Sequence, residues 1–106
     1  MIRVSEADDG REIEIIVGET LELALPETSG TGFSWAFTAR GEAILALEDE
    51  YTTSVATAPG SGRMRCWRFK AIASGNATLA LGFSRPWQKS PPARSFSVKL
   101  HVGGLP

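Results

Sequence analysis

The chain has 106 residues, with 11 Lys and Arg against 12 Asp and Glu, so its formal net charge is −1. Its composition, 42% hydrophobic and 22% charged, is close to that of an average globular domain, which argues against disordered, collagen-like and coiled-coil chains. A chain of this length buries roughly two thirds of its surface on folding, enough for one core. We therefore expect a single domain spanning residues 1–106.

The charges are divided unequally between the two halves of the chain. Residues 1–50 carry 3 basic and all 12 acidic side chains, or −9, whereas residues 51–106 carry 8 basic and no acidic side chains, or +8. Such an asymmetry either marks a charged partner, such as nucleic acid, or is neutralised when the two halves pair on folding.

Cysteine, histidine and long apolar runs are too scarce for several common kinds of site. The single cysteine, Cys66, excludes an internal disulfide, and with the single histidine, His101, it falls short of a structural zinc site. We expect no metal and no cofactor. The first residues include acids where a signal peptide has its apolar core, and no apolar run approaches the ~20 residues that span a bilayer. We therefore expect a soluble chain without membrane contact, either cytoplasmic or a mature exported form.

Apolar residues alternate with polar ones along most of the chain, which is the period of a half-buried β-strand. Residues 41–50 could form a helix, but three consecutive acids at their end oppose the helix dipole, so we interpret them as strand or irregular. In chain order the alternation predicts strands over residues 12–17, 20–25, 33–37, 63–73, 78–83 and 96–102.

Clusters of turn-forming residues separate the predicted strands. They lie at residues 8–10, 26–32, 58–62, 74–76 and 84–92. About seven to eight short strands between such turns predict an all-β fold, an immunoglobulin-like β-sandwich.

Three of these turn clusters have a composition that ordinary hairpins do not need. Residues 26–32 are long, polar and contain two glycines, and residues 59–62 form a glycine-rich turn. The third cluster is stiffened by three prolines and contains Arg85 and Trp87, residue types enriched in binding hot spots. From this pattern alone, a binding role and simple loop packing explain Arg85 and Trp87 equally well.

Other residues that could carry chemistry fit structural roles better. Trp35 and Trp67 lie in alternating strands with aromatic neighbours, so we expect both in the core. Cys66 lies within a strand, with no helix N-terminus before it to lower its pKa, so we expect a packed thiol rather than a nucleophile paired with His101. We therefore expect that the protein is not an enzyme.

With the three loops in this order, the sequence resembles the chagasin family of reversible inhibitors of papain-like cysteine peptidases. The family's first loop has an Asn-Pro-Thr-Thr-Gly-(Tyr/Phe)-x-Trp motif, which residues 28–35 match from Thr31 onward. Its Gly-x-Gly-Gly turn is matched by residues 60–63, with Arg63 in place of the last glycine, and its Arg-Pro-(Trp/Phe) motif by residues 85–87.

The resemblance implies a sandwich whose three loops, residues 28–33, 60–63 and 85–87, fill the cleft of a papain-like cysteine peptidase without being cleaved. Thr31 would approach the catalytic cysteine, and the glycines beside it would let the backbone come close. We expect the inhibitor to be a monomer. The residues implied to contact the peptidase are Thr28, Ser29, Gly30, Thr31, Gly32, Phe33, Gly60, Ser61, Gly62, Arg63, Arg85, Pro86 and Trp87.

Two alternative functions stay open at this point. Basic residues alternate with Trp67 and Phe69 on a predicted strand, as in modules that bind single-stranded nucleic acid, but this function requires an exposed Trp67. An immunoglobulin-like interaction module without inhibitory activity would leave the Arg85 to Trp87 motif unexplained.

The predicted fold favours neutralisation of the charge asymmetry rather than a nucleic-acid partner. Acidic early strands and basic late strands interleave in such a sandwich, so most charges should pair across strands. At the binding end we expect a modestly basic surface, with Glu27 beside the first loop and Arg63 and Arg85 marking the other two.

Overall fold

The computed structural model describes residues 1–27, 32–54, 62–85, 87 and 91–104. Across these residues the chain is almost entirely β-structure, with one short 3-10 helix, η1. The elements in chain order are β1 (Ile2–Ser5), η1 (Glu6–Asp8), β2 (Glu12–Ile16), β3 (Thr20–Glu27), β4 (Ser34–Ala39), β5 (Leu45–Ser54), β6 (Arg63–Ala71), β7 (Gly75–Ser84) and β8 (Arg94–Gly103).

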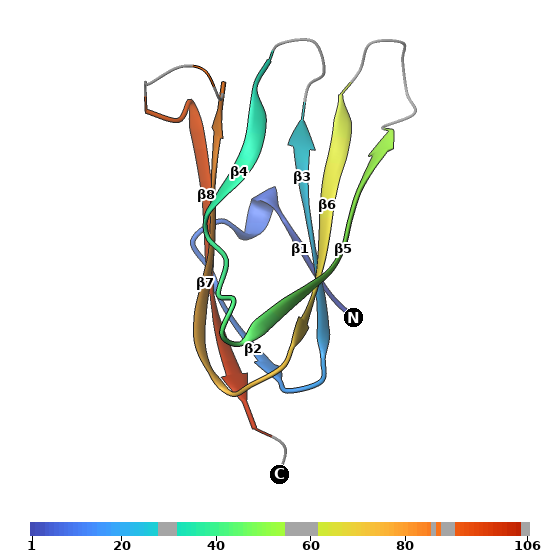
Figure 1. Cartoon of the computed structure of the whole chain (residues 1–106), viewed down its shortest axis with the longest axis vertical. Coiled ribbons are helices and arrows are strands. Elements are labelled where there is room, and N and C mark those ends of the chain that lie inside the picture. Colours follow the sequence, from blue (N-terminus) through green and yellow to red (C-terminus); the bar gives the residue numbers. More distant parts are fainter. Residues whose placement is uncertain (28–31, 55–61, 86, 88–90, 105–106) are drawn as a thin grey trace.

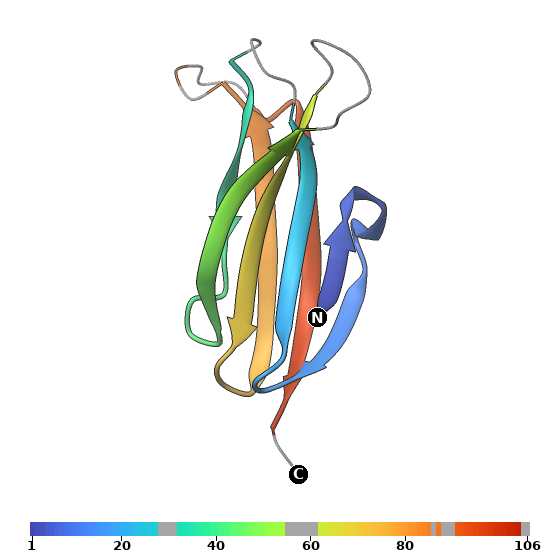
Figure 2. The same ribbon diagram turned by 90° about the vertical axis from the view of Figure 1, so that its right-hand side faces the viewer.

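The described strands form two four-stranded sheets, in the orders β1-β3-β6-β5 and β2-β8-β7-β4. The sheets lie face to face as the two layers of a sandwich (Figures 1 and 2). Most neighbouring strands are antiparallel, whereas β1 pairs with β3 and β2 pairs with β8 in parallel. The predicted all-β sandwich is confirmed. Residues 41–50, interpreted as strand or irregular, are irregular over residues 41–44 and belong to β5 from Leu45 onward.

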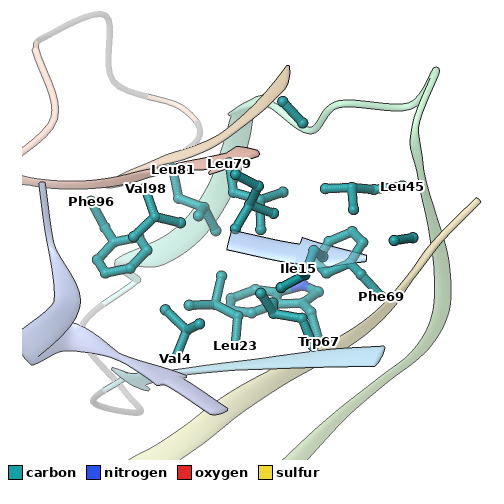
Figure 3. Packing of buried hydrophobic residues seen from close by; sticks show 14 of the residues in the cluster. Val4, Ile15, Leu23, Leu45, Trp67, Phe69, Leu79, Leu81, Phe96 and Val98 are labelled. Atoms are coloured by element: carbon teal, nitrogen blue, oxygen red, sulfur yellow. The ribbon is translucent and has the colours of Figure 1, made fainter. Parts of the chain in front are cut away.

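The core lies between the two sheets and consists of the side chains that alternation turns inward. Trp67 and Phe69 of β6 lie opposite Leu79 and Leu81 of β7 in this layer (Figure 3). Trp67 is 2% exposed and Trp35 is 4% exposed, so both are core residues as predicted. The buried Trp67 contradicts the requirement of a nucleic-acid-binding strand for an exposed aromatic platform.

The structure differs from the sequence prediction in two places near the N-terminus, the strand β1 and the end of β3. No strand was predicted before residue 12, but Ile2–Ser5 forms β1, with Val4 as its single buried side chain. A strand this short shows too few alternations to be recognised. The turn at residues 26–32 was predicted to begin at Pro26, but β3 continues to Glu27 because Pro26 and Glu27 still pair with Met64 and Arg63 of β6.

Charges from the two halves of the chain pair across strands, as predicted. The basic strand β6 lies between the acidic strands β3 and β5. Arg68 of β6 binds Glu22 of β3 at 3.1 Å, and Arg65 of β6 binds Glu50 of β5. Much of the charge asymmetry is therefore neutralised within this sheet.

The strand ends that flank the three predicted loops lie together at one end of the sandwich (Figure 1). These are the end of β3 and the start of β4, the end of β5 and the start of β6, and the end of β7 and the start of β8. We call this the loop end. Among the residues described, no helix is long and apolar enough to cross a membrane.

Candidate functional site

The structure describes part of each predicted loop at the loop end. Gly32 and Phe33 belong to the first loop, Gly62 and Arg63 to the second, and Arg85 and Trp87 to the third. The other predicted contact residues lie outside the described residues: Thr28, Ser29, Gly30, Thr31, Gly60, Ser61 and Pro86.

The first and third loops touch through Gly32 and Trp87. Gly32 has a φ of +81°, and a Cβ atom placed on it would lie 2.5 Å from Cη2 of Trp87. Only glycine therefore permits both this backbone conformation and this approach of the indole ring. Trp87 nevertheless remains 69% exposed, so most of its ring is available to a partner.

Aromatic stacking fixes Phe33 and Arg85 above the end of the core. The ring of Phe33 stacks on that of Phe83, with their centroids 5.4 Å apart. The ring centroids of Phe83 and Trp35 are 4.9 Å apart. The guanidinium carbon of Arg85 lies 4.6 Å from the centroid of Phe33. Cation–π contacts of this kind are worth about 0.5–2 kcal/mol, so Arg85 is held in place by the first loop.

Trp35 joins the two strands that carry the first loop. Its indole Nε1 donates a hydrogen bond of 2.8 Å to the carbonyl oxygen of Pro26 in β3. The guanidinium of Arg94, the first residue of β8, lies 5.6 Å from the Trp35 ring centroid and also binds Glu6 of η1. The Gly-Phe-x-Trp run of residues 32–35 therefore places one aromatic side chain, Phe33, on the loop and another, Trp35, beneath it.

Glu27 is the site residue whose role the sequence analysis missed. Its side chain is 3% exposed and accepts a 3.0 Å hydrogen bond from Nη2 of Arg63 and a 3.4 Å hydrogen bond from the backbone N–H of Trp35. Nη1 of Arg65 lies 3.6 Å from the same carboxylate. The signal was present, because position 27 continues the inward alternation of Leu23 and Leu25.

The positive charge of Arg63 is paired with the buried carboxylate of Glu27. Arg63 is the first residue of β6, and its side chain is 46% exposed while bound to Glu27. The basic surface expected from Arg63 and Arg85 is thus reduced by an internal carboxylate. Nearly half of the Arg63 side chain nevertheless remains open to a partner.

The described residues at the loop end are suited to binding rather than to covalent chemistry. Burial raises the pKa of the Cys66 thiol, and His101 is engaged elsewhere, with Asn76 Oδ1 at 2.8 Å and Glu12 Oε1 at 3.0 Å. No group of three or more His, Cys, Asp or Glu side chains gathers to hold a metal within the described part of the chain. The surface combines the exposed indole of Trp87, the guanidinium of Arg85 stacked on Phe33, and Gly32, whose backbone the indole approaches closely.

Known proteins resemble this chain over nearly its whole length. The model of the family described as "Chagasin family peptidase inhibitor I42" matches residues 14–102. Chagasin of Trypanosoma cruzi is 28% identical over 104 residues, which cover 92% of this chain and 94% of that protein. The crystal structure of a cysteine protease inhibitor from Entamoeba histolytica has a TM-score of 0.88 at 22% identity, covering 96% of this chain and 95% of that chain. PbICP-C, solved in complex with falcipain-2, has a TM-score of 0.63 at 14% identity, covering 99% and 100%.

Proposed function

The chain belongs to the chagasin family of peptidase inhibitors, and we propose that it blocks papain-like cysteine peptidases by filling their active-site cleft with its loop end. Members of this family inhibit cysteine peptidases, so the chain is an inhibitor and not an enzyme. The related PbICP-C was solved in complex with falcipain-2, a papain-like peptidase, which supports this class of target. We take residues 1–106 as one inhibitory domain.

The observation that carries the proposal is the contact between Gly32 and Trp87. It joins two loops that are separated in the chain by four strands, β4 to β7, into one surface, while 69% of Trp87 stays exposed. A monomeric domain has little reason to expose a tryptophan beside a glycine that must remain a glycine unless a partner covers both. A peptidase cleft is such a partner.

Inhibition then works by occlusion. Thr28 to Phe33 would enter the cleft, with Thr31 nearest the catalytic cysteine, while Arg85, Pro86 and Trp87 cover one flank. Gly60 to Arg63 would cover the other flank through the backbone and the exposed part of the Arg63 guanidinium. A standard interface of about 1,600 Å² can bind tightly when its loops are already ordered, because little conformational entropy is lost.

The proposal is tested by measuring the hydrolysis of a fluorogenic peptide by papain at increasing concentrations of the purified protein. We expect inhibition at or below micromolar concentration, recovery of activity on dilution, and an uncleaved inhibitor by mass spectrometry. Trypsin, which uses a serine nucleophile, is the control and should remain active. Full papain activity in micromolar protein would contradict the proposal.

A further inference from the structure

We propose that Glu27 is a positioning residue that fixes the first and second loops relative to each other, so that the affinity for the peptidase depends on the buried Glu27 carboxylate. This inference rests on the proposed inhibitory function and deepens it. Glu27 lies beneath the loops rather than on the surface assigned to the peptidase, because its side chain is only 3% exposed.

The carboxylate of Glu27 joins the two strand ends that carry the first loop. Glu27 is the last residue of β3 and immediately precedes residues 28–33. The backbone N–H of Trp35, in β4 just after that loop, donates to Oε2 of Glu27 at 3.4 Å. Since β3 and β4 belong to different sheets, this bond also connects the two layers of the sandwich at the loop end.

The same carboxylate reaches the strand that follows the second loop. Arg63, the first residue of β6, donates from Nη2 to Oε1 of Glu27 at 3.0 Å. Arg65 lies 3.6 Å from Oε2 of Glu27 and also binds Glu50 of β5. Glu27 is therefore the central member of a network that spans β3, β4, β6 and, through Arg65, β5.

A carboxylate at this inward position has no advantage for burial alone. Leu21, Leu23 and Leu25 occupy the preceding inward positions of β3 and are completely buried. Burying a carboxylate costs free energy unless it is paired, and a leucine would pack without that cost. Unlike a leucine, a carboxylate requires its donors at defined distances and directions, so it fixes the positions of Trp35 and Arg63.

A fixed arrangement of the loops favours binding because disordered loops would lose entropy when they enter a cleft. Loss of the carboxylate should therefore weaken inhibition even when the sandwich stays folded. A residue that only stabilises the fold would instead lower the unfolding temperature and leave the inhibition constant of the folded protein unchanged.

The test compares Glu27→Gln with Glu22→Gln. Glu22 is also a β3 carboxylate bound to an arginine of β6, at 3.1 Å from Arg68, but it lies away from the loop end and turns to the outer face. At a temperature where circular dichroism shows each variant fully folded, Glu27→Gln should raise the inhibition constant for papain at least about tenfold, or about 1.4 kcal/mol. Glu22→Gln should leave it within about twofold.

A conservative variant and a readout without peptidase keep the inference testable if Glu27→Gln folds poorly. Glu27→Asp keeps the charge but shortens the reach, so its inhibition constant should lie between those of the original protein and Glu27→Gln. In the free protein, NMR amide signals of Gly32 and Gly62, one in each loop, should shift in Glu27→Gln and Glu27→Asp but not in Glu22→Gln.

The possible failures are distinguishable. If the original protein does not inhibit papain, the proposed function is wrong, whereas unshifted Gly32 and Gly62 signals in both Glu27 variants overturn the positioning role. If the original protein inhibits papain and the folded Glu27 variants inhibit equally well, the positioning role is overturned while the proposed function stands.

Discussion

Trp87 shows at the level of one residue how the loop end is prepared for a partner. It is the most exposed of the large hydrophobic side chains in the described part of the chain. Its ring rests on Gly32, which limits its freedom before binding. An exposed and restrained tryptophan is characteristic of the anchors that contribute most to binding free energy.

Replacement of Trp87 by alanine is expected to weaken inhibition of papain by more than about 1 kcal/mol, as hot-spot truncations do. The fold should be retained, because the exposed ring contributes little to the core. Ile72→Ala is the matched control, since Ile72 is also an exposed apolar residue, at 52%, but follows β6 at the opposite end. An unchanged inhibition constant for Trp87→Ala would remove the third loop from the mechanism.

Gly32→Ala is expected to impair inhibition through two effects. A non-glycine residue in the left-handed region costs about 1–2 kcal/mol of stability, and the new Cβ would push against the Trp87 ring. Gly10→Ala isolates the first effect, because Gly10 has a nearly equal φ of +83° and open space around it. Urea unfolding should show similar losses of stability for the two variants, whereas the inhibition constant for papain should rise only for Gly32→Ala. Equal inhibition by both variants would argue against the Gly32–Trp87 contact as a binding element.

At the level of elements, polar contacts on the outer face connect β6 with its two neighbouring strands, β3 and β5. Tyr51 of β5 donates a 2.6 Å hydrogen bond to Oε2 of Glu22 in β3, and Arg68 of β6 binds the same oxygen. The hydrogen bond from Tyr51 and the charge of Arg68 lower the pKa of Glu22, and the same bond raises the pKa of Tyr51 to about 12. Three strands are thus connected by one ionised carboxylate.

This network predicts a pH-dependent contribution to stability. Because the pKa of Glu22 is lowered on folding, its contribution is present above the ordinary value of 4.5 and is lost as the pH falls through the lowered value. Tyr51→Phe should therefore reduce the free energy of unfolding more at pH 7 than at pH 3, as measured by urea unfolding. In a Glu22→Gln background the effect of Tyr51→Phe should be the same at both pH values, and a pH-independent effect in the original background would contradict this account.

The strands were predictable from sequence to the extent that their alternation was long. Leu21, Leu23 and Leu25 defined β3, whereas β1 is too short for the pattern. The same alternation, extended to position 27, indicated that Glu27 points inward, but its partner could not be predicted because the strand register is what brings Arg63 opposite. Likewise, the Gly32–Trp87 contact joins residues far apart in the chain, so the motifs predicted the loops but not their contact.

For the whole molecule, the charge asymmetry is an internal feature of the sandwich. The acidic half supplies Glu22, Glu27 and Glu50, and the basic strand β6 lies against all of them. The basic residues of β6 therefore do not form a continuous positive face of the kind that tracks a phosphate backbone.

This neutralisation predicts no salt-dependent binding of single-stranded oligonucleotides. Fluorescence anisotropy of a labelled oligonucleotide should stay unchanged on addition of micromolar protein at about 50 mM salt, where electrostatic binding is strong. Binding that declines steeply with added salt, together with absent inhibition of papain, would instead favour the nucleic-acid function.

The central claim is that one end of the sandwich occupies the cleft of a papain-like peptidase. NMR mapping of the isotopically labelled protein with papain tests it most directly. The account predicts that the signals of Gly32, Phe33, Arg85 and Trp87 change on binding, while those of Asn76 and His101, paired across β7 and β8 toward the opposite end, stay in place. Changes confined to Asn76 and His101, or no change at the loop end with papain in excess, would contradict it.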